Sequence, residues 1–263
     1  MSFLTVKQGA LEYLISTLID VPHGFSTRLG GVSQGYLSSL NLGISRGDRP
    51  ENVLKNYGIL GSAIGFRPED TVFTRQVHGD VVCRVGRANR GEGLLHPVKE
   101  DRDGLMTNET GIMLTIFTAD CVPVLFYDPV TRSVAGAHAG WRGTAMGIVR
   151  RTVEEMTRQF GAKPRDIRAA IGPSIGKCCF ETHDDVPQAM YQALGCAAQA
   201  YISPSGEKYH VDLKGINAHW LRKAGLEWID VSEDCTACQP ERFWSHRVTC
   251  GQRGAQAAVI GLP

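Results

Sequence analysis

The distribution of hydrophobic and polar positions predicts strands and helices in mixed order along the chain. Two short apolar runs, residues 112–117 and 122–127, are typical of buried strands, and the polar turn 118–121 (Thr-Ala-Asp-Cys) separates them. The small residues of Ser133–Ala139 indicate a further strand. Residues 141–160 place apolar side chains near helical spacing, with charged side chains opposite, which predicts one long helix.

Another helix is predicted to begin around Pro50. Asp48 is expected to cap its N-terminus, with Glu51 completing a capping box and Pro50 in the first turn. The helix is expected to continue to about Leu60.

The β-branched residues of segment 71–85 predict a pair of strands that turns near Gly79 and Asp80. The other predicted elements are a strand at 167–171, helices at 184–194 and 212–224, and strands at Trp228–Val231 and 255–260. Strands and helices do not alternate in a strict βαβ order, and no repeat, linker or low-complexity segment divides the chain. We therefore predict an α+β fold, a single domain over residues 1–263 in which helices cover mixed β-sheets.

Composition and charge exclude several classes of protein. The chain has 263 residues, of which 43% are hydrophobic and 21% charged, as is usual for globular proteins. Its net charge of +1 gives no sign of a nucleic-acid partner or an anionic membrane. No apolar run approaches the roughly 20 residues of a membrane span. Lys7 and Glu12 come too early for a signal peptide, so we expect a cytoplasmic protein with reduced cysteines.

The strongest candidate site consists of His78, Cys121 and His138, which lie at or near predicted strand ends beside glycine or aspartate. One thiolate and two imidazoles suit a catalytic zinc ion, which keeps three protein ligands and one open position. In a metal-free alternative, Cys121 is a nucleophile and His138 its base. In a third interpretation, all three are buried residues without a ligand.

A second motif, G-x-S-x-G at residues 172–176, matches a nucleophile elbow with Ser174 as nucleophile. Pro173 stiffens the turn, no clear helix follows it, and little chain remains for the later strands and the triad acid and base. A glycine-rich turn is therefore the preferred interpretation. The residues that would complete the triad are Asp184 or Asp212 with His210, His219 or His246.

The other cysteines allow two further interpretations. Cys235 and Cys238 form a C-x-x-C pair that, with His246 and Cys250, is a candidate structural zinc site, although the spacing is not that of a standard finger. Ordinary thiols are the alternative. The adjacent pair Cys178-Cys179 lacks a partner motif and is interpreted as structural.

Two families of metalloenzyme are excluded by missing motifs. The chain has no H-x-E followed by P-C-x-x-C, as in zinc nucleobase deaminases, and no H-E-x-x-H. The paired His-x-His stretches of multi-copper oxidases are also absent.

The segments TRQVHGD, TADCVPVLFYDP, VAGAHAGWRGTAMGIV and AAIGPSIGKCCFE together resemble the polyphenol oxidase or laccase-domain family. The resemblance extends from GFSTRLGGVS to VTCGQRG, nearly the whole chain. It implies a fold similar to the catalytic domain of a toxin deamidase, which has the Cys-His pair of a cysteine hydrolase. It also implies a zinc site at His78, Cys121 and His138. Copper, despite the historical name, is not expected. The family usually reads SYRRDG where this chain has SHRVTCGQRG, so no role for Arg247 is carried over.

Members of this family are described as purine nucleoside phosphorylases and adenosine deaminases, and some bacterial members as peptidoglycan editing factors. The resemblance implies phosphorolysis of adenosine, inosine, guanosine or methylthioadenosine to base and ribose 1-phosphate, and deamination of adenosine to inosine. Zinc would lower the pKa of a bound water to about 7, for attack on C6 of adenosine. The implied partners are purine nucleosides and phosphate.

For this chemistry we assign further roles as hypotheses. Arg142, at the start of the helix 141–160, is expected to hold phosphate. Asp120 is expected to orient a metal ligand or transfer a proton. Asn41 and Gln76 are expected to hydrogen-bond ribose or base, and Glu181 is a further acid or base.

Two alternative functions remain. The first is a Cys-His hydrolase or amidase that edits peptidoglycan precursors in the cytoplasm. The second is a non-catalytic binding protein with a structural zinc ion.

Overall fold

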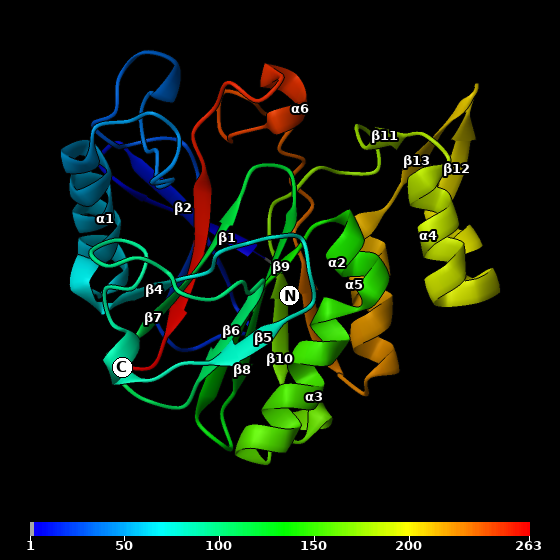
Figure 1. Ribbon diagram of the computed structural model, residues 1–263, viewed down its shortest axis with the longest axis horizontal. Coiled ribbons are helices and arrows are strands. Elements are labelled where there is room, and N and C mark those ends of the chain that lie inside the picture. Colours follow the sequence, from blue (N-terminus) through cyan, green and yellow to red (C-terminus); the bar gives the residue numbers. More distant parts are fainter. Residues whose placement is uncertain (1–2) are drawn as a thin grey trace.

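The two apolar runs form central strands of two different sheets in the computed structural model, which describes residues 3–263 (Figure 1). Strand β7 (Met113–Thr118) lies between β15 and β4, and strand β8 (Val122–Asp128) lies between β10 and β9. Both strands are covered on both faces, which explains why their residues are almost continuously apolar.

The first sheet has six strands in the order β1-β2-β3-β15-β7-β4. Its pairs are antiparallel, except that β4 runs parallel to β7. The bounds of the strands not yet given are β1 (Phe3–Gln8), β2 (Leu11–Ser16), β3 (His23–Ser26), β4 (Thr71–Phe73) and β15 (Gln256–Gly261).

The second sheet has six strands in the order β14-β10-β8-β9-β6-β5, with parallel pairs at both edges. Its other strands are β5 (Val82–Arg84), β6 (Gly104–Thr107), β9 (Ser133–Ala139), β10 (Arg168–Ile171) and β14 (Trp228–Val231). A third, small sheet contains β11 (Glu181–Thr182), β13 (Lys208–Val211) and β12 (Ile202–Ser205). Mixed sheets together with helices confirm the predicted α+β class.

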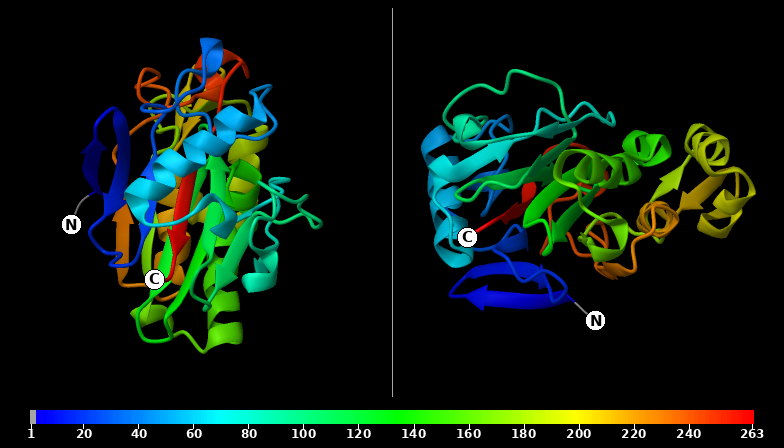
Figure 2. Two further views of the ribbon diagram at one scale, coloured as in Figure 1. Left: turned by 90° about the vertical axis from the view of Figure 1, so that its left-hand side faces the viewer. Right: turned by 90° about the horizontal axis from the view of Figure 1, so that it is seen from below.

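Alternating side chains of the central strands fill three layers of core. Leu114 of β7 and Leu125 of β8 pack between the two large sheets. Met113 packs on the opposite face against helix α1, and Val124 packs against α3 and α5. Figures 1 and 2 show α1 on one side of the sheets and α3 on the other. The order helix, sheet, sheet, helix buries both faces of the central strands of each large sheet.

The helices are α1 (Pro50–Ile64), α2 (Trp141–Met146), α3 (Ile148–Phe160), α4 (Asp185–Leu194), α5 (Leu213–Lys223) and α6 (His246–Thr249). Short 3-10 turns occur at Gly35–Leu37, Pro68–Asp70, Arg87–Asn89, Pro164–Asp166 and Gly195–Tyr201. None of the helices within residues 3–263 has the length and apolar character needed to cross a bilayer.

Helix α1 begins at Pro50 as predicted, but its predicted N-cap is wrong by one residue. Arg49, not Asp48, is the N-cap, and no side chain caps the helix. The Asp48 carboxylate instead accepts hydrogen bonds from Ser33 and Asn41, at 2.6 and 3.0 Å, and from the Arg49 N–H. The helix continues four residues beyond Leu60 to Ile64 and is capped by Gly65, whose φ of 100° only glycine adopts readily.

The predicted strand pair in segment 71–85 is also wrong, because its halves belong to different sheets. β4 pairs with β7 and β5 pairs with β6, so residues 74–81 pass from one sheet to the other. The single helix predicted at 141–160 is divided into α2 and α3 at Gly147, where φ is 76°.

The remaining predicted strands and helices are confirmed within one or two residues. The predicted similarity to a toxin deamidase stays a prediction.

Candidate metal centre and its pocket

The pairing of β8 with β9 brings Cys121 beside His138. Val122 pairs with Ala139 and Pro123 with His138, so the residue that precedes β8 lies next to the end of β9. The crossing segment 74–81 then places His78 against both: its Nε2 is 3.9 Å from Cys121 Sγ. The three ligand atoms lie within 4.8 Å of one another, so the predicted trio does come together as a possible metal site.

A buried carboxylate, Asp103, orients both histidines. Its Oδ1 is 2.7 Å from His138 Nδ1, and the carboxylate accepts the backbone N–H groups of Val77, His78 and Gly79 at 2.9–3.0 Å. These bonds hold His78 at its positive φ of 63°. Because Nδ1 of His138 is engaged, Nε2 is the nitrogen left for an ion.

Charge within the trio favours a thiolate. Burial alone would raise the pKa of Cys121, but the neighbouring His138 and His78 outweigh it and lower the pKa to about 6. Burial would lower the pKa of His138, but Cys121 and Asp103 raise it to about 9. Near neutral pH the metal-free pair is therefore a thiolate beside an imidazolium.

Gly140, directly after β9, leaves room for the trio. A Cβ at this position would lie 2.7 Å from His78 Cδ2 and 3.4 Å from Cys121 Sγ. A side chain there would displace His78, so the close approach of the ligands depends on glycine. One sulfur and two imidazole nitrogens fit a borderline-soft transition metal and leave a coordination position open.

The trio opens into a small cavity of about 130 Å³, next to a larger one of about 380 Å³. The two cavities share the lining residues Arg46, Gln76, Phe117 and Ala255. Phe73 adds an aromatic wall to the larger cavity, and its ring meets that of Phe117 edge to face. A cavity with an aromatic wall and several polar lining residues therefore adjoins the candidate metal site, as in many small-molecule sites.

Arg46 and Arg253 bring positive charge to the small cavity. Burial and the charge of Arg46 lower the pKa of Arg253 to about 10. Arg253 donates from Nη1 to the carbonyl of Gly254, while its Nε is buried without a partner. Within residues 3–263 neither arginine forms an ion pair with a carboxylate, so the pair suits an anion.

Of the two residues predicted to hydrogen-bond ribose or base, Gln76 lines the pocket and Asn41 does not. Gln76 lines both cavities, but its amide exchanges two hydrogen bonds of 2.8 Å with the backbone of Phe117. Asn41 is fully buried: its Oδ1 accepts from Gly43 and Ala255, and it does not line either cavity. Asn41 therefore shapes the loop behind the pocket.

Three other predicted residues point elsewhere. The Asp120 carboxylate accepts from Thr236, Ser245 and the Arg247 backbone, away from the ligands. The Arg142 guanidinium stacks on Trp141 at the surface, and α2 is only six residues long. Glu181 pairs with Lys208, in the small third sheet. None of them lines either cavity.

Sequence reasoning missed Asp103, Arg46 and Arg253. Asp103 precedes a short strand that was not predicted, and both arginines lie in glycine-rich loops without any ligand-like spacing. Among the segments that carry the family resemblance, SLNLG at 39–43 ends shortly before Arg46, and VTCGQRG at 248–254 contains Arg253, but neither indicates a role for its arginine.

Within residues 3–263, no histidine side chain hydrogen-bonds Ser174, so the G-x-S-x-G motif is not part of a catalytic triad. Ser174 is fully buried and its hydroxyl has no hydrogen-bond partner. His210 bonds the carbonyl of Lys177 and His219 lies against Tyr201. The turn interpretation therefore stands.

Comparison with known proteins places these features in a family. Residues 22–263 match the family described as multi-copper polyphenol oxidoreductase laccase. The chain is 40% identical over 253 residues to a purine nucleoside phosphorylase of Deinococcus radiodurans, which covers 96% of this chain and 94% of the relative. It is 38% identical over 248 residues to the purine nucleoside phosphorylase YlmD of Bacillus subtilis, with 92% and 89% covered.

A solved structure shares the fold over nearly the full length. The hypothetical protein YfiH of Bacillus licheniformis superposes with a TM-score of 0.93 at 35% identity, with 99% of each chain covered. The resemblance seen in the sequence motifs is thus confirmed. The chain belongs to the multi-copper polyphenol oxidoreductase laccase family.

Proposed function

We propose that this protein is a zinc-dependent purine nucleoside phosphorylase that also deaminates adenosine. The names of the relatives support the reaction class. The observation that carries the proposal is the pair Arg46 and Arg253, which lines the same cavity as the trio His78, Cys121 and His138. Phosphate is the anion that this reaction requires.

Phosphorolysis makes one bond and breaks another. A phosphate oxygen bonds to C1′ of the ribose, the C1′–N9 bond breaks, and its electron pair leaves with the purine, which takes up a proton. The guanidinium groups of Arg46 and Arg253 would hold the phosphate by charge-assisted hydrogen bonds. Phe73 and Phe117 would pack against the base in the larger cavity.

Zinc fits the trio by its donor set. Held by His78, Cys121 and His138, the ion would act as a Lewis acid and lower the pKa of water near the substrate. Asp103 keeps the Nδ1 proton on His138 and so presents Nε2 inward. Deamination replaces the C6 amino group of adenosine with oxygen from water and releases ammonia.

The test is a product assay on protein of measured zinc content. We expect adenine and ribose 1-phosphate from adenosine only when phosphate is present, and inosine without phosphate. Arg253→Gln should raise the KM for phosphate by about tenfold or more, because a charge-assisted contact of roughly 1.5–3 kcal/mol is lost. The control, Arg142→Gln, removes a surface arginine and should leave that KM unchanged. Absence of turnover at full zinc occupancy would contradict the proposal.

A second function is favoured by the lowered pKa of Cys121 beside His138. A thiolate–imidazolium pair is the nucleophile of cysteine hydrolases, here an amidase acting on peptidoglycan precursors. Rapid alkylation of Cys121 by iodoacetamide in protein as purified, without chelator, would favour it. A zinc-bound Cys121 should be protected until the metal is removed.

We further propose that the whole chain acts as one domain in the cytoplasm, where its eight cysteines stay reduced. Purine nucleosides and phosphate are then its partners, and fractionation of cells that produce the protein checks the location.

A further inference from the structure

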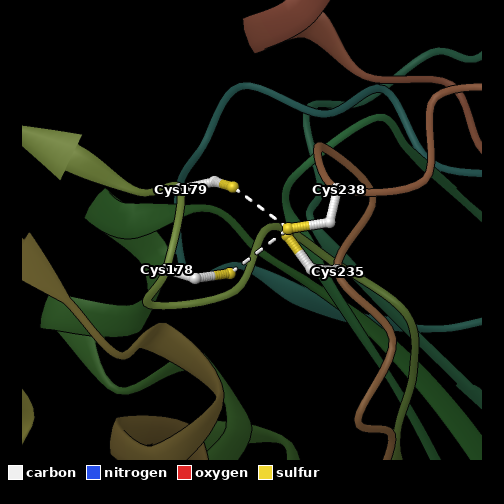
Figure 3. A group of neighbouring side chains, drawn as sticks. All are labelled: Cys178, Cys179, Cys235 and Cys238. Carbon is white, nitrogen blue, oxygen red and sulfur yellow. Dashed lines mark hydrogen bonds between the residues drawn. The ribbon is translucent and has the colours of Figure 1, made fainter.

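Four cysteines from two distant segments meet at one point, away from the trio. Cys178 and Cys179 come from the loop between β10 and β11, and Cys235 and Cys238 come from the loop after β14 (Figure 3). The four sulfur atoms lie within 4.8 Å of one another, and Cys238 Sγ is 3.6 Å from that of Cys178 and 3.3 Å from that of Cys179.

The fold itself holds these two loops together. β10 and β14 are parallel neighbours, so the segments that follow them leave the same edge of the sheet. Ser174 and Cys235 continue the pairing as an isolated bridge, in which the Thr236 N–H donates to the Ser174 carbonyl at 3.1 Å. The Gly176 N–H points at Cys235 Sγ at 3.1 Å. Backbone pairing therefore places the two cysteine-bearing loops side by side.

The predicted partners of the C-x-x-C pair are thereby corrected. His246 and Cys250 lie in and after α6 and are not in this group, whereas the adjacent pair Cys178-Cys179 is. Sequence spacing favoured His246 and Cys250 because they follow closely, but the parallel strands bring an earlier loop instead.

The spacing of the sulfur atoms suits a single ion. Around zinc, with bonds of about 2.3 Å to four thiolates, neighbouring sulfur atoms of a tetrahedron are about 3.8 Å apart. A polynuclear iron–sulfur cluster would hold some of its cysteines farther apart, since they bind different iron atoms. Four thiolates around a divalent ion carry two net negative charges. The buried ammonium of Lys214, bound to the carbonyls of Ser232 and Asp234 at 2.7 and 3.0 Å, offsets part of that charge.

We propose that Cys178, Cys179, Cys235 and Cys238 form a second, structural zinc site. Four protein ligands close the coordination sphere, so the ion takes no part in turnover.

The site would stabilise the loops that hold Asp120, the neighbour of the ligand Cys121. Ile175, in the first loop, donates its N–H to the Asp120 carbonyl, and Thr236, in the second, donates to its carboxylate at 2.7 Å. Asp120 has a φ of 89°, which is strained for aspartate. An ion that joins the two loops would thus hold Asp120 in place, and through Asp120 the adjacent residue Cys121.

Zinc content per chain, measured by inductively coupled plasma mass spectrometry, tests the proposal. Wild-type protein should carry about two zinc ions, and Cys121→Ala and the double variant Cys235→Ser/Cys238→Ser about one each. The matched control, Cys196→Ser/Cys250→Ser, removes two exposed cysteines outside both groups and should keep about two.

A second measurement covers the case in which the double variant does not fold. Cobalt-substituted Cys121→Ala should show the intense visible and thiolate charge-transfer bands of tetrahedral cobalt with four sulfur ligands. One metal ion in the wild type and none in Cys121→Ala would overturn the proposal. So would iron in place of zinc, or an intact mass, measured without reductant, that shows these cysteines joined as disulfides.

Discussion

His138 Nδ1 lies 2.7 Å from Asp103 Oδ1, and the same oxygen accepts the backbone N–H of His78 at 3.0 Å. One carboxylate thus positions two candidate metal ligands that are far apart in sequence. The two ligands cannot shift independently, because both depend on the same buried group.

Asp103→Asn should weaken zinc binding by about 10- to 100-fold, as is usual when a group that orients a histidine ligand is changed. The amide keeps an acceptor but loses the charge that raises the pKa of His138. Competition with a chromophoric chelator measures the affinity. Asp101→Asn, which removes an exposed carboxylate paired with Arg75, is the control and should bind zinc as the wild type does. Equal affinities in both variants would refute the role of Asp103.

Zinc binding at the trio should release about one proton per ion between pH 6 and 9. In this window metal-free Cys121 is already a thiolate, while His138 must lose its proton to bind. Affinity should rise about tenfold per pH unit there, more steeply below pH 6, and level off above pH 9. Calorimetry in buffers of different ionisation enthalpy counts the protons, with Cys121→Ala as the blank. Zero protons at pH 7.5 would show that His138 is neutral.

Gly140→Ala should lower zinc affinity while leaving the fold intact. The added methyl group would meet His78 Cδ2 at 2.7 Å, so the ring must move away from Cys121. The expected loss is at least tenfold, comparable to that of a misplaced ligand. Circular dichroism checks folding and chelator competition checks affinity. Gly58→Ala serves as control, because nothing lies within 4 Å of a Cβ at that position.

Leu125→Ala should lower the free energy of unfolding by about 2–5 kcal/mol, because it leaves a cavity between the two large sheets. Leu54, on α1, is 43% exposed, so Leu54→Ala should cost well under half as much. Urea denaturation of zinc-loaded protein gives both values. Similar losses for the two variants would mean that the sheets are not packed as described.

Sequence reasoning succeeded where one local feature determines the structure. β8 and β9 are buried on both faces, so their apolar runs match their bounds almost to the residue. It failed where the structure depends on which strands, distant in sequence, pair with one another. Residues 71–85 have strand composition, but composition does not say that β4 and β5 join different sheets. A single glycine inside a helical pattern does not show that Gly147 takes a positive φ and breaks the helix.

The residues of the candidate site show the same contrast between local and long-range information. His78, Cys121 and His138 were found because thiol and imidazole groups beside glycine or aspartate are chemically distinctive. Asp103 and Arg253 were not found, because only the fold shows that one contacts His138 and the other lines the same cavity as the trio. Asp120 was chosen for its adjacency to Cys121, yet its positive φ turns the carboxylate the other way.

The position of β15 has a consequence for synthesis on the ribosome. This late strand lies between β3 and β7, so the first sheet stays split until residues 256–261 have left the exit tunnel. The trio at 78, 121 and 138, by contrast, belongs to segments translated much earlier. A nascent chain therefore contains all three residues of the trio before Arg253 is synthesised, and its pocket becomes complete only when the last strand is inserted.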